Sequence, residues 1–233
     1  MATILDDKLF SLRLASRPEF QLRLAEFLHS YGSADRPALV VQARQAPDSQ
    51  SGAVDVDDPE VQKRFLAGVG SKDGWWQGFR SMTAVRATFH GIASLPAREQ
   101  PAWAAEAHRD GHFIAGIWRF PEFSIRDSKV FALADFYVGM FNDFFQLVVS
   151  TLQAGSEPPE YEVTASLVRA PALHYARRSG FGSECVIDGP LTIDNLQWPI
   201  AAARVGTPKW TSLGAQMGKA LTGAYGDTPP QMQ

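Results

Sequence analysis

The stretch SKVFALADFYVGMFNDFFQLVVSTLQ, residues 128–153, decides the fold of this chain. Apolar residues recur in it at steps of three and four, which predicts an α-helix. The main stripe consists of Phe131, Ala134, Val138, Phe141, Phe145, Val148 and Leu152. Further apolar residues widen that stripe, so we expect a helix that is buried on nearly every side. Because Asp135 and Asp143 would be costly in a bilayer, we interpret the segment as a core helix.

Sequence signals on both sides of this helix predict the remaining elements. Caps, breakers and periodicity indicate helices at residues 16–31, 58–70, 98–109 and 207–226, and strands at residues 39–43, 83–94, 112–120, 160–168 and 191–203. The segment 172–189 is expected to be a loop. This order is not the regular alternation of a doubly wound sheet. We therefore predict an α+β fold, in which a mixed or antiparallel sheet packs on a long, largely buried helix, with N- and C-terminal helices.

Length and composition set the class of protein. A chain of 233 residues with 45% hydrophobic residues is long enough to bury a core as one domain. We expect that domain to span residues 1–226, followed by a disordered tail at 227–233. A net charge of −3 gives no basic footprint over the whole domain. The single cysteine excludes an internal disulfide and a multi-cysteine zinc site. Because residues 1–7 contain no signal peptide, we expect a cytoplasmic protein with no membrane association.

Histidines and carboxylates supply the first set of candidate catalytic residues. The set consists of His90, His108, His112, Glu106 and Asp110. On one helix, His108 and His112 would share a face, as metal ligands often do. Gly111 is expected to end that helix, and ordinary polar residues around a helix end are the alternative interpretation. No hydrolytic metal motif is present. We therefore predict no metal and no cofactor.

Two other groups are candidate binding residues. Arg169, His174, Tyr175, Arg177 and Arg178 are cationic or aromatic residues that are suited to phosphates and stacked bases. A solvated turn is the alternative interpretation of that segment.

The adjacent residues Trp75 and Trp76 lie between two glycines. Tryptophan is enriched at binding hot spots, so the pair is a candidate site for a protein partner. A lid over the core is the alternative interpretation.

The second half of the chain contains three segments with a shared pattern. They read LQAGSEPPEYEVTASLVRAPALHYA, DGPLTIDNLQWPIAAARVG and MGKALTGAYG. Over residues 131–226 this pattern resembles the C-terminal region of bacterial AlbA-like, Schlafen-type DNA-binding proteins. The resemblance implies an accessory module of a nucleic-acid-associated or defence system, and it carries over no catalytic residue. The first half of the chain lacks the acidic-lysine core of the AlbA-like domain.

No sequence motif in the chain is specific enough to identify a reaction. Apolar residues are numerous and periodic, whereas reactive groups are scattered. We therefore predict a non-catalytic binding or accessory subunit of an intracellular assembly, with a protein partner or a second copy of the chain, and with nucleic acid as a further possible partner. The alternative is an enzyme whose histidine and carboxylate site forms only in three dimensions.

Overall fold

The structure is a computed structural model. It describes residues 17–31, 36–49, 54–67, 79, 85–96, 102–118, 130–152, 158–170, 173–178, 185–188 and 195–225. Helices in these ranges are α2 (Pro18–Tyr31), α3 (Pro59–Ala67), α4 (Ala134–Leu152) and α5 (Pro208–Ala224). Strands are β1 (Ala38–Gln45), β2 (Arg86–Ala87), β3 (Gly91–Ser94), β4 (Trp103–His108), β5 (Phe113–Ile117), β6 (Val130–Leu133), β7 (Glu160–Val168), β8 (Leu173–Arg178), β9 (Cys185–Asp188), β10 (Asn195–Gln197) and β11 (Ala201–Arg204).

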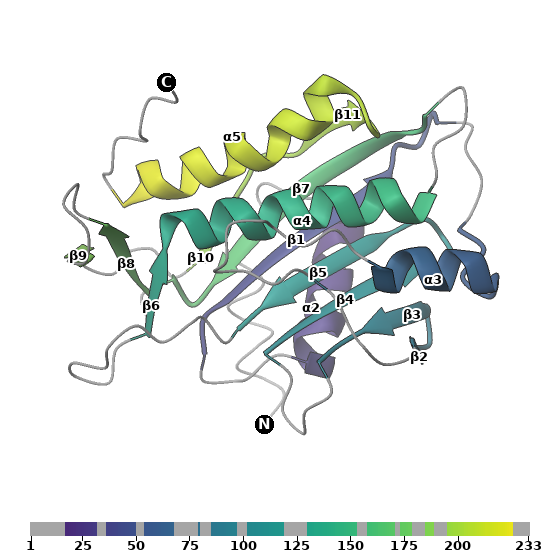
Figure 1. The fold of residues 1–233 in the computed structure, drawn as a ribbon, viewed down its shortest axis with the longest axis horizontal. Coiled ribbons are helices and arrows are strands. Elements are labelled where there is room, and N and C mark those ends of the chain that lie inside the picture. Colours follow the sequence, from purple (N-terminus) through teal and green to yellow (C-terminus); the bar gives the residue numbers. More distant parts are fainter. Residues whose placement is uncertain are drawn as a thin grey trace.

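The described strands form one large antiparallel sheet and one small sheet. The large sheet has eight strands, in the order β10-β7-β1-β5-β4-β3-β2, and β11 also pairs with β7. The small sheet has the order β6-β8-β9, in which β6 and β8 are parallel. Helices lie on both faces of the large sheet (Figure 1). This arrangement confirms the predicted α+β class, with a sheet packed on a long helix and with helices towards both ends of the chain.

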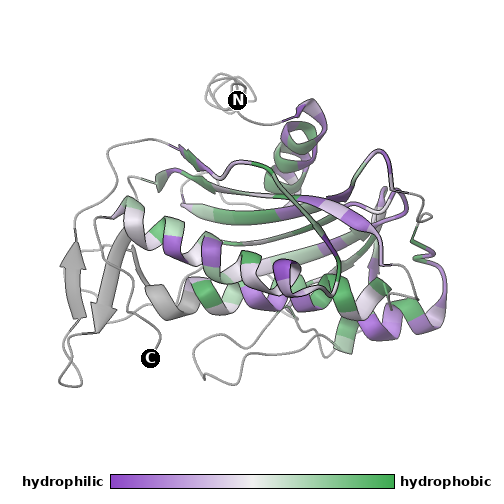
Figure 2. Ribbon diagram, turned by 90° about the horizontal axis from the view of Figure 1, so that it is seen from above, coloured by the Kyte–Doolittle hydropathy of each residue, from purple (hydrophilic) through white to green (hydrophobic). Residues whose placement is uncertain are grey.

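The two faces of the large sheet are covered differently. Along β1, Leu39 and Val41 belong to the cluster under α4, whereas Val40 belongs to the cluster under α2, as expected for alternating strand residues. Figure 2 shows the sheet nearly edge on, with α2 on one side and α3, α4 and α5 on the other. Because the short helix α2 covers only part of its face, that face has room for polar side chains as well as a small apolar cluster.

Helix α4 is buried on nearly every side, as its sequence predicts. Its apolar side chains with exposed fractions of 2% or less are Tyr137, Met140, Phe141, Phe144, Phe145, Leu147 and Val148. The sheet lies on one side of α4, and α5 and α3 contact it on others (Figure 1). At Gly218 of α5 the helices are so close that a Cβ would lie 2.5 Å from Cγ2 of Val138. From Tyr137 onward, the apolar surface of α4 is thus covered by the chain itself.

The predicted helix at 98–109 is wrong, because residues 103–108 form strand β4. Alanines at 102, 104, 105 and 107 raise the helix propensity of this segment. In the structure, Ala104, Ala105 and Ala107 are completely buried inside the sheet. Pairing with β3 and β5 therefore overrides the local preference.

Three other segments differ in secondary structure from the prediction. The predicted strand at 83–94 is a hairpin of β2 and β3, with a tight turn between them. The predicted loop at 172–189 contains the paired strands β8 and β9. The predicted long helix begins with strand β6 at residues 130–133 and becomes helical at Ala134. Trp75, Trp76 and the predicted tail at 227–233 lie outside the described residues.

Of the helices that the structure describes, none combines the length and the apolar character needed to span a membrane.

Candidate functional site

The three histidines of the first candidate set lie next to one another. His90 is in the turn between β2 and β3, His108 ends β4, and His112 directly precedes β5. The ring centroids of His90 and His108 are 5.1 Å apart, and those of His108 and His112 are 5.6 Å apart. Strand pairing causes this, because Gly91 is opposite His108 in the β3–β4 register. A β-hairpin, and not one helix face, brings His108 and His112 together.

The turn between β4 and β5 sets the relative positions of His108, Asp110 and His112. Gly111 has a φ of +78°, a left-handed conformation that glycine adopts without strain. The His108 N–H donates to the His112 carbonyl at 2.8 Å, which closes the hairpin. The His112 N–H donates to Oδ1 of Asp110 at 3.1 Å. Burial opposes ionisation of Asp110, but this hydrogen bond and the nearby Arg23 guanidinium together lower its pKa.

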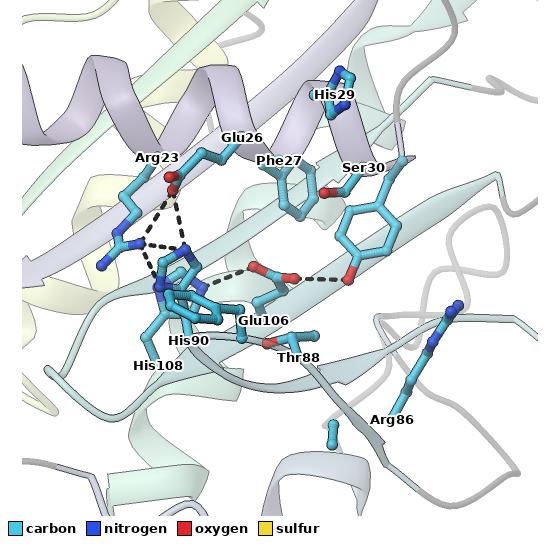
Figure 3. A pocket seen from close by; sticks show the side chains of 13 residues that line it. Arg23, Glu26, Phe27, His29, Ser30, Arg86, Thr88, His90, Glu106 and His108 are labelled. Carbon is cyan, nitrogen blue, oxygen red and sulfur yellow. Dashed lines mark hydrogen bonds and ion pairs between the residues drawn. The ribbon is translucent and has the colours of Figure 1, made fainter.

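A buried chain of hydrogen bonds runs behind His90. The Tyr31 hydroxyl donates to Oε1 of Glu106 at 2.7 Å, and Oε2 of Glu106 lies 2.7 Å from Nε2 of His108 (Figure 3). The side chains of His108 and Glu106 are only 2% and 9% exposed. Burial, and then the adjacent Glu106 carboxylate, raise the pKa of Tyr31, so its hydroxyl keeps its proton. Among the described residues, Nδ1 of His108 has no hydrogen-bond partner.

Helix α2 supplies charged side chains that the sequence analysis did not select. Nη1 of Arg23 lies 2.6 Å from Nδ1 and 2.7 Å from Nε2 of His90. The Arg23 guanidinium also donates to Glu26 and to Asp110, each at 3.1 Å. Oε2 of Glu26 lies 3.2 Å from Nε2 of His90. Arg23 and Glu26 are three residues apart, so they share one face of the predicted helix. This spacing is the sequence signal that could have identified them as site residues.

A pocket of about 400 Å³ opens beside these groups. Its walls come from α2, from the β2–β3 hairpin and from β4, and both His90 and His108 line it (Figure 3). His90 is 24% exposed on its side chain, whereas His108 lies deeper. The volume falls within the range of small-molecule sites. The pocket thus combines a solvent-facing imidazole with a buried carboxylate–imidazole pair.

His112 lies apart from the pocket and is fully buried. Nε2 of His112 lies 3.2 Å from Oε1 of Gln42, and the Phe20 ring packs edge-on against the imidazole. Burial, and then the nearby His108, lower the pKa of His112 to about 3. A histidine with this pKa is neutral at physiological pH, so His112 supports the site as a neutral, packed side chain.

The hairpin that carries His90 depends on glycine at position 91. A Cβ at Gly91 would collide with the carbonyl oxygen of Ala107 and approach Cα of His108 to 2.9 Å. We expect Gly91→Ala to lower the free energy of unfolding by about 2–3 kcal/mol, because backbone atoms of β4 must move. Urea denaturation measures this. Gly223→Ala is the matched control, since nothing lies within 4 Å of a Cβ there. Equal effects of the two substitutions would contradict the close approach of β3 to β4.

The second candidate set is divided between the two sheets. Arg169 follows β7 with a φ of +57°, and Nη1 of its guanidinium donates to the carbonyl of Arg36 at 3.1 Å. The other four residues of that set, His174, Tyr175, Arg177 and Arg178, belong to β8 of the small sheet. Binding of phosphate or nucleic acid by this set stays a prediction.

The metal interpretation of the histidines receives no support from the described part of the chain. Within it, no group of three or more histidine, cysteine, aspartate or glutamate side chains is arranged to hold a metal ion.

Comparison with known proteins adds no relative. No protein-family model, curated protein or solved structure matches this chain. The resemblance of residues 131–226 to AlbA-like, Schlafen-type proteins therefore stays a prediction.

Proposed function

We propose that this protein is an enzyme that transfers protons on a small polar molecule, with Glu106 and His108 as the central pair. The observation that carries the proposal is the hydrogen-bonded chain from Tyr31 through Glu106 to His108 in the wall of a pocket. General acid–base catalysis needs an imidazole that is oriented by a second group and close to a substrate site. These three side chains come from α2 and β4, and their hydrogen bonds supply the oriented imidazole.

The pair suggests a specific division of roles. Because the Glu106 carboxylate accepts a hydrogen bond, a neutral His108 carries its proton on Nε2. Nδ1 of His108 then keeps a lone pair with no hydrogen-bond partner among the described residues. Because that atom is buried, we assign the transfer of a substrate proton to it by way of the more exposed His90 imidazole, whose ring centroid lies 5.1 Å away. The Tyr31 hydroxyl donates to the other carboxylate oxygen, which holds Glu106 in place. In this scheme His108 is the base and Glu106 is a positioning residue.

His90 and its neighbours stand between this pair and solvent. The Arg23 guanidinium and the Glu26 carboxylate both contact the His90 imidazole, so three polar groups border the mouth. Such groups orient a polar ligand by hydrogen bonds, while the rest of a pocket wall excludes water. We assign substrate positioning to Arg23 and His90.

The prediction of a non-catalytic binding subunit remains the rival hypothesis. Its strongest sequence argument was the excess apolar surface of the long helix. Helix α4 is covered by the sheet and by α3 and α5 within one chain. The apolar surface of α4 therefore gives no argument for a protein partner. The clustered histidines and carboxylates favour the enzyme hypothesis.

A turnover screen tests the proposed function. The protein is incubated with a panel of carboxylates, phosphates, esters and amides, and the products are followed by NMR. We expect at least one compound to be converted, and His108→Asn to slow that conversion by about 10²–10⁴-fold, the usual contribution of a general base. Glu106→Gln should lower kcat and shift the pH profile, because the imidazole loses its orienting charge.

The matched control is Glu160→Gln, which replaces an exposed glutamate of β7 outside the pocket and should leave turnover unchanged. Circular dichroism verifies that each variant is folded. Conversion that persists in a folded His108→Asn variant refutes the proposal, and so does a panel in which no compound is converted.

A further inference from the structure

The tip of the β2–β3 hairpin carries two side chains into the pocket wall. Residues Thr88 and Gly91 close the turn, since the Thr88 N–H donates to the Gly91 carbonyl at 2.9 Å and the Gly91 N–H donates to Oγ1 of Thr88 at 3.1 Å. The two loop residues between them are Phe89 and His90, and both line the pocket. The His90 carbonyl accepts from the Arg109 N–H at 3.0 Å. The tip is therefore held against the β4–β5 turn.

Phe89 is an exposed aromatic residue in a turn whose geometry does not require an aromatic side chain. Two-residue hairpin loops favour Asn, Asp and Gly, which supply turn geometry and solubility. Phe89 is 93% exposed, the largest value among the large hydrophobic residues that the structure describes. Its ring meets the His90 imidazole edge-on at 5.0 Å. An aromatic face is thus presented beside the imidazole that borders the mouth of the pocket.

Arg86 adds a positive charge on the same hairpin. The residue is exposed and lines the pocket, and no ion-pair partner of its guanidinium lies among the described residues. Arg23 differs, because Glu26 and Asp110 already pair with it. Arg86 lies close enough to Tyr31 to act electrostatically on its hydroxyl. Its guanidinium can therefore pair with an anionic group at the end of the pocket where the Tyr31–Glu106–His108 chain begins.

We propose that the molecule bound in this pocket has a planar unsaturated ring that bears a carboxylate or phosphate group. The ring packs on Phe89, and the anionic group pairs with Arg86. This inference rests on the proposed function and names the substrate class of the same site. Packing on Phe89 and pairing with Arg86 would hold such a molecule beside the His90 imidazole at the mouth of the pocket.

Matched ligands test the inference by isothermal titration calorimetry. The carboxylate probes are benzoate, cyclohexanecarboxylate and acetate, and the phosphate probes are phenyl phosphate and inorganic phosphate. We expect each phenyl compound to bind about tenfold more tightly than its counterpart without a ring. Phe89→Ala should remove about two- to tenfold of that preference. Arg86→Gln should weaken binding of all the anions by about tenfold.

Two exposed residues away from the pocket provide matched controls. Leu22→Ala removes another exposed apolar side chain, and Arg204→Gln removes another exposed arginine. Neither should change binding. Benzoate and cyclohexanecarboxylate binding equally would overturn the inference, as would failure of both phenyl probes to bind or unchanged binding in Phe89→Ala and Arg86→Gln. The turnover screen is independent of these outcomes, because it includes compounds without rings and depends on His108.

Discussion

The conformational stability of this protein should fall steeply as the pH drops below 6.5, and His112 should be a main cause. The pKa of His112 is lowered from 6.5 to about 3 in the folded state, chiefly by burial. As the pH falls through this window, the unfolded chain takes up a proton that the folded chain refuses. The free energy of unfolding therefore decreases, with a contribution that approaches about 1.4 kcal/mol per pH unit below pH 6.

Burial sets the direction of the pKa shift, because it disfavours the charged imidazolium, and most of the groups around the ring add to it. His108, Arg23 and Arg44 disfavour a positive charge on His112, while Asp110 favours it and is outweighed. A histidine whose pKa is depressed by folding contributes its stability in the neutral form. That stability is complete above pH 6.5 and is lost as the pH approaches the folded pKa of about 3.

Urea unfolding between pH 6.5 and 4.5 measures the effect. His112→Gln introduces an amide that can hydrogen-bond to Gln42 but cannot titrate. The free energy of unfolding of this variant should therefore fall by about 2 kcal/mol less over this pH range than that of the unsubstituted protein. His29→Gln, at an exposed position on α2, is the matched control and should behave as the unsubstituted protein. Parallel pH curves for the unsubstituted protein and His112→Gln would contradict the buried, neutral histidine.

The parts of the fold that the sequence predicts are those with a strong local pattern. Strand β7 alternates polar and apolar residues from Glu160 to Leu167, and α5 begins at a Thr207–Pro208 cap that the structure contains. The wrong prediction at 98–109 has the opposite origin. Alanine has no strong periodic signal, and only pairing with β3 and β5 makes residues 103–108 a strand.

The candidate site could be predicted in part. His90, His108, His112, Glu106 and Asp110 are chemically conspicuous, and the structure brings all five together. Their arrangement was beyond the sequence, because it depends on the β3–β4–β5 register. The contributions of α2 were missed for a related reason. Arg23 contacts His90 from 67 residues away, and no pattern in the chain indicates where α2 packs on the sheet.

Replacing Trp210 by alanine should lower the free energy of unfolding by about 3–5 kcal/mol, the usual cost of truncating a buried aromatic side chain. Trp210 is 1% exposed and lies where α5, α4 and β7 meet. Its ring meets Phe145 edge-on at 4.9 Å and Tyr161 at 6.1 Å. The indole N–H also donates to the Phe145 carbonyl at 3.1 Å. Alanine would leave a cavity that three rigid elements cannot close.

Two further substitutions separate packing from the hydrogen bond. Trp210→Phe keeps an aromatic ring but removes the N–H donor, so it should cost less, about 1–3 kcal/mol. Phe89→Ala removes an aromatic ring that is 93% exposed and should change stability by no more than about 0.5 kcal/mol. Urea denaturation of the three variants gives the comparison. If Trp210→Ala and Phe89→Ala cost the same, α5 is not packed on α4 through Trp210, because only a buried ring leaves a cavity when it is removed.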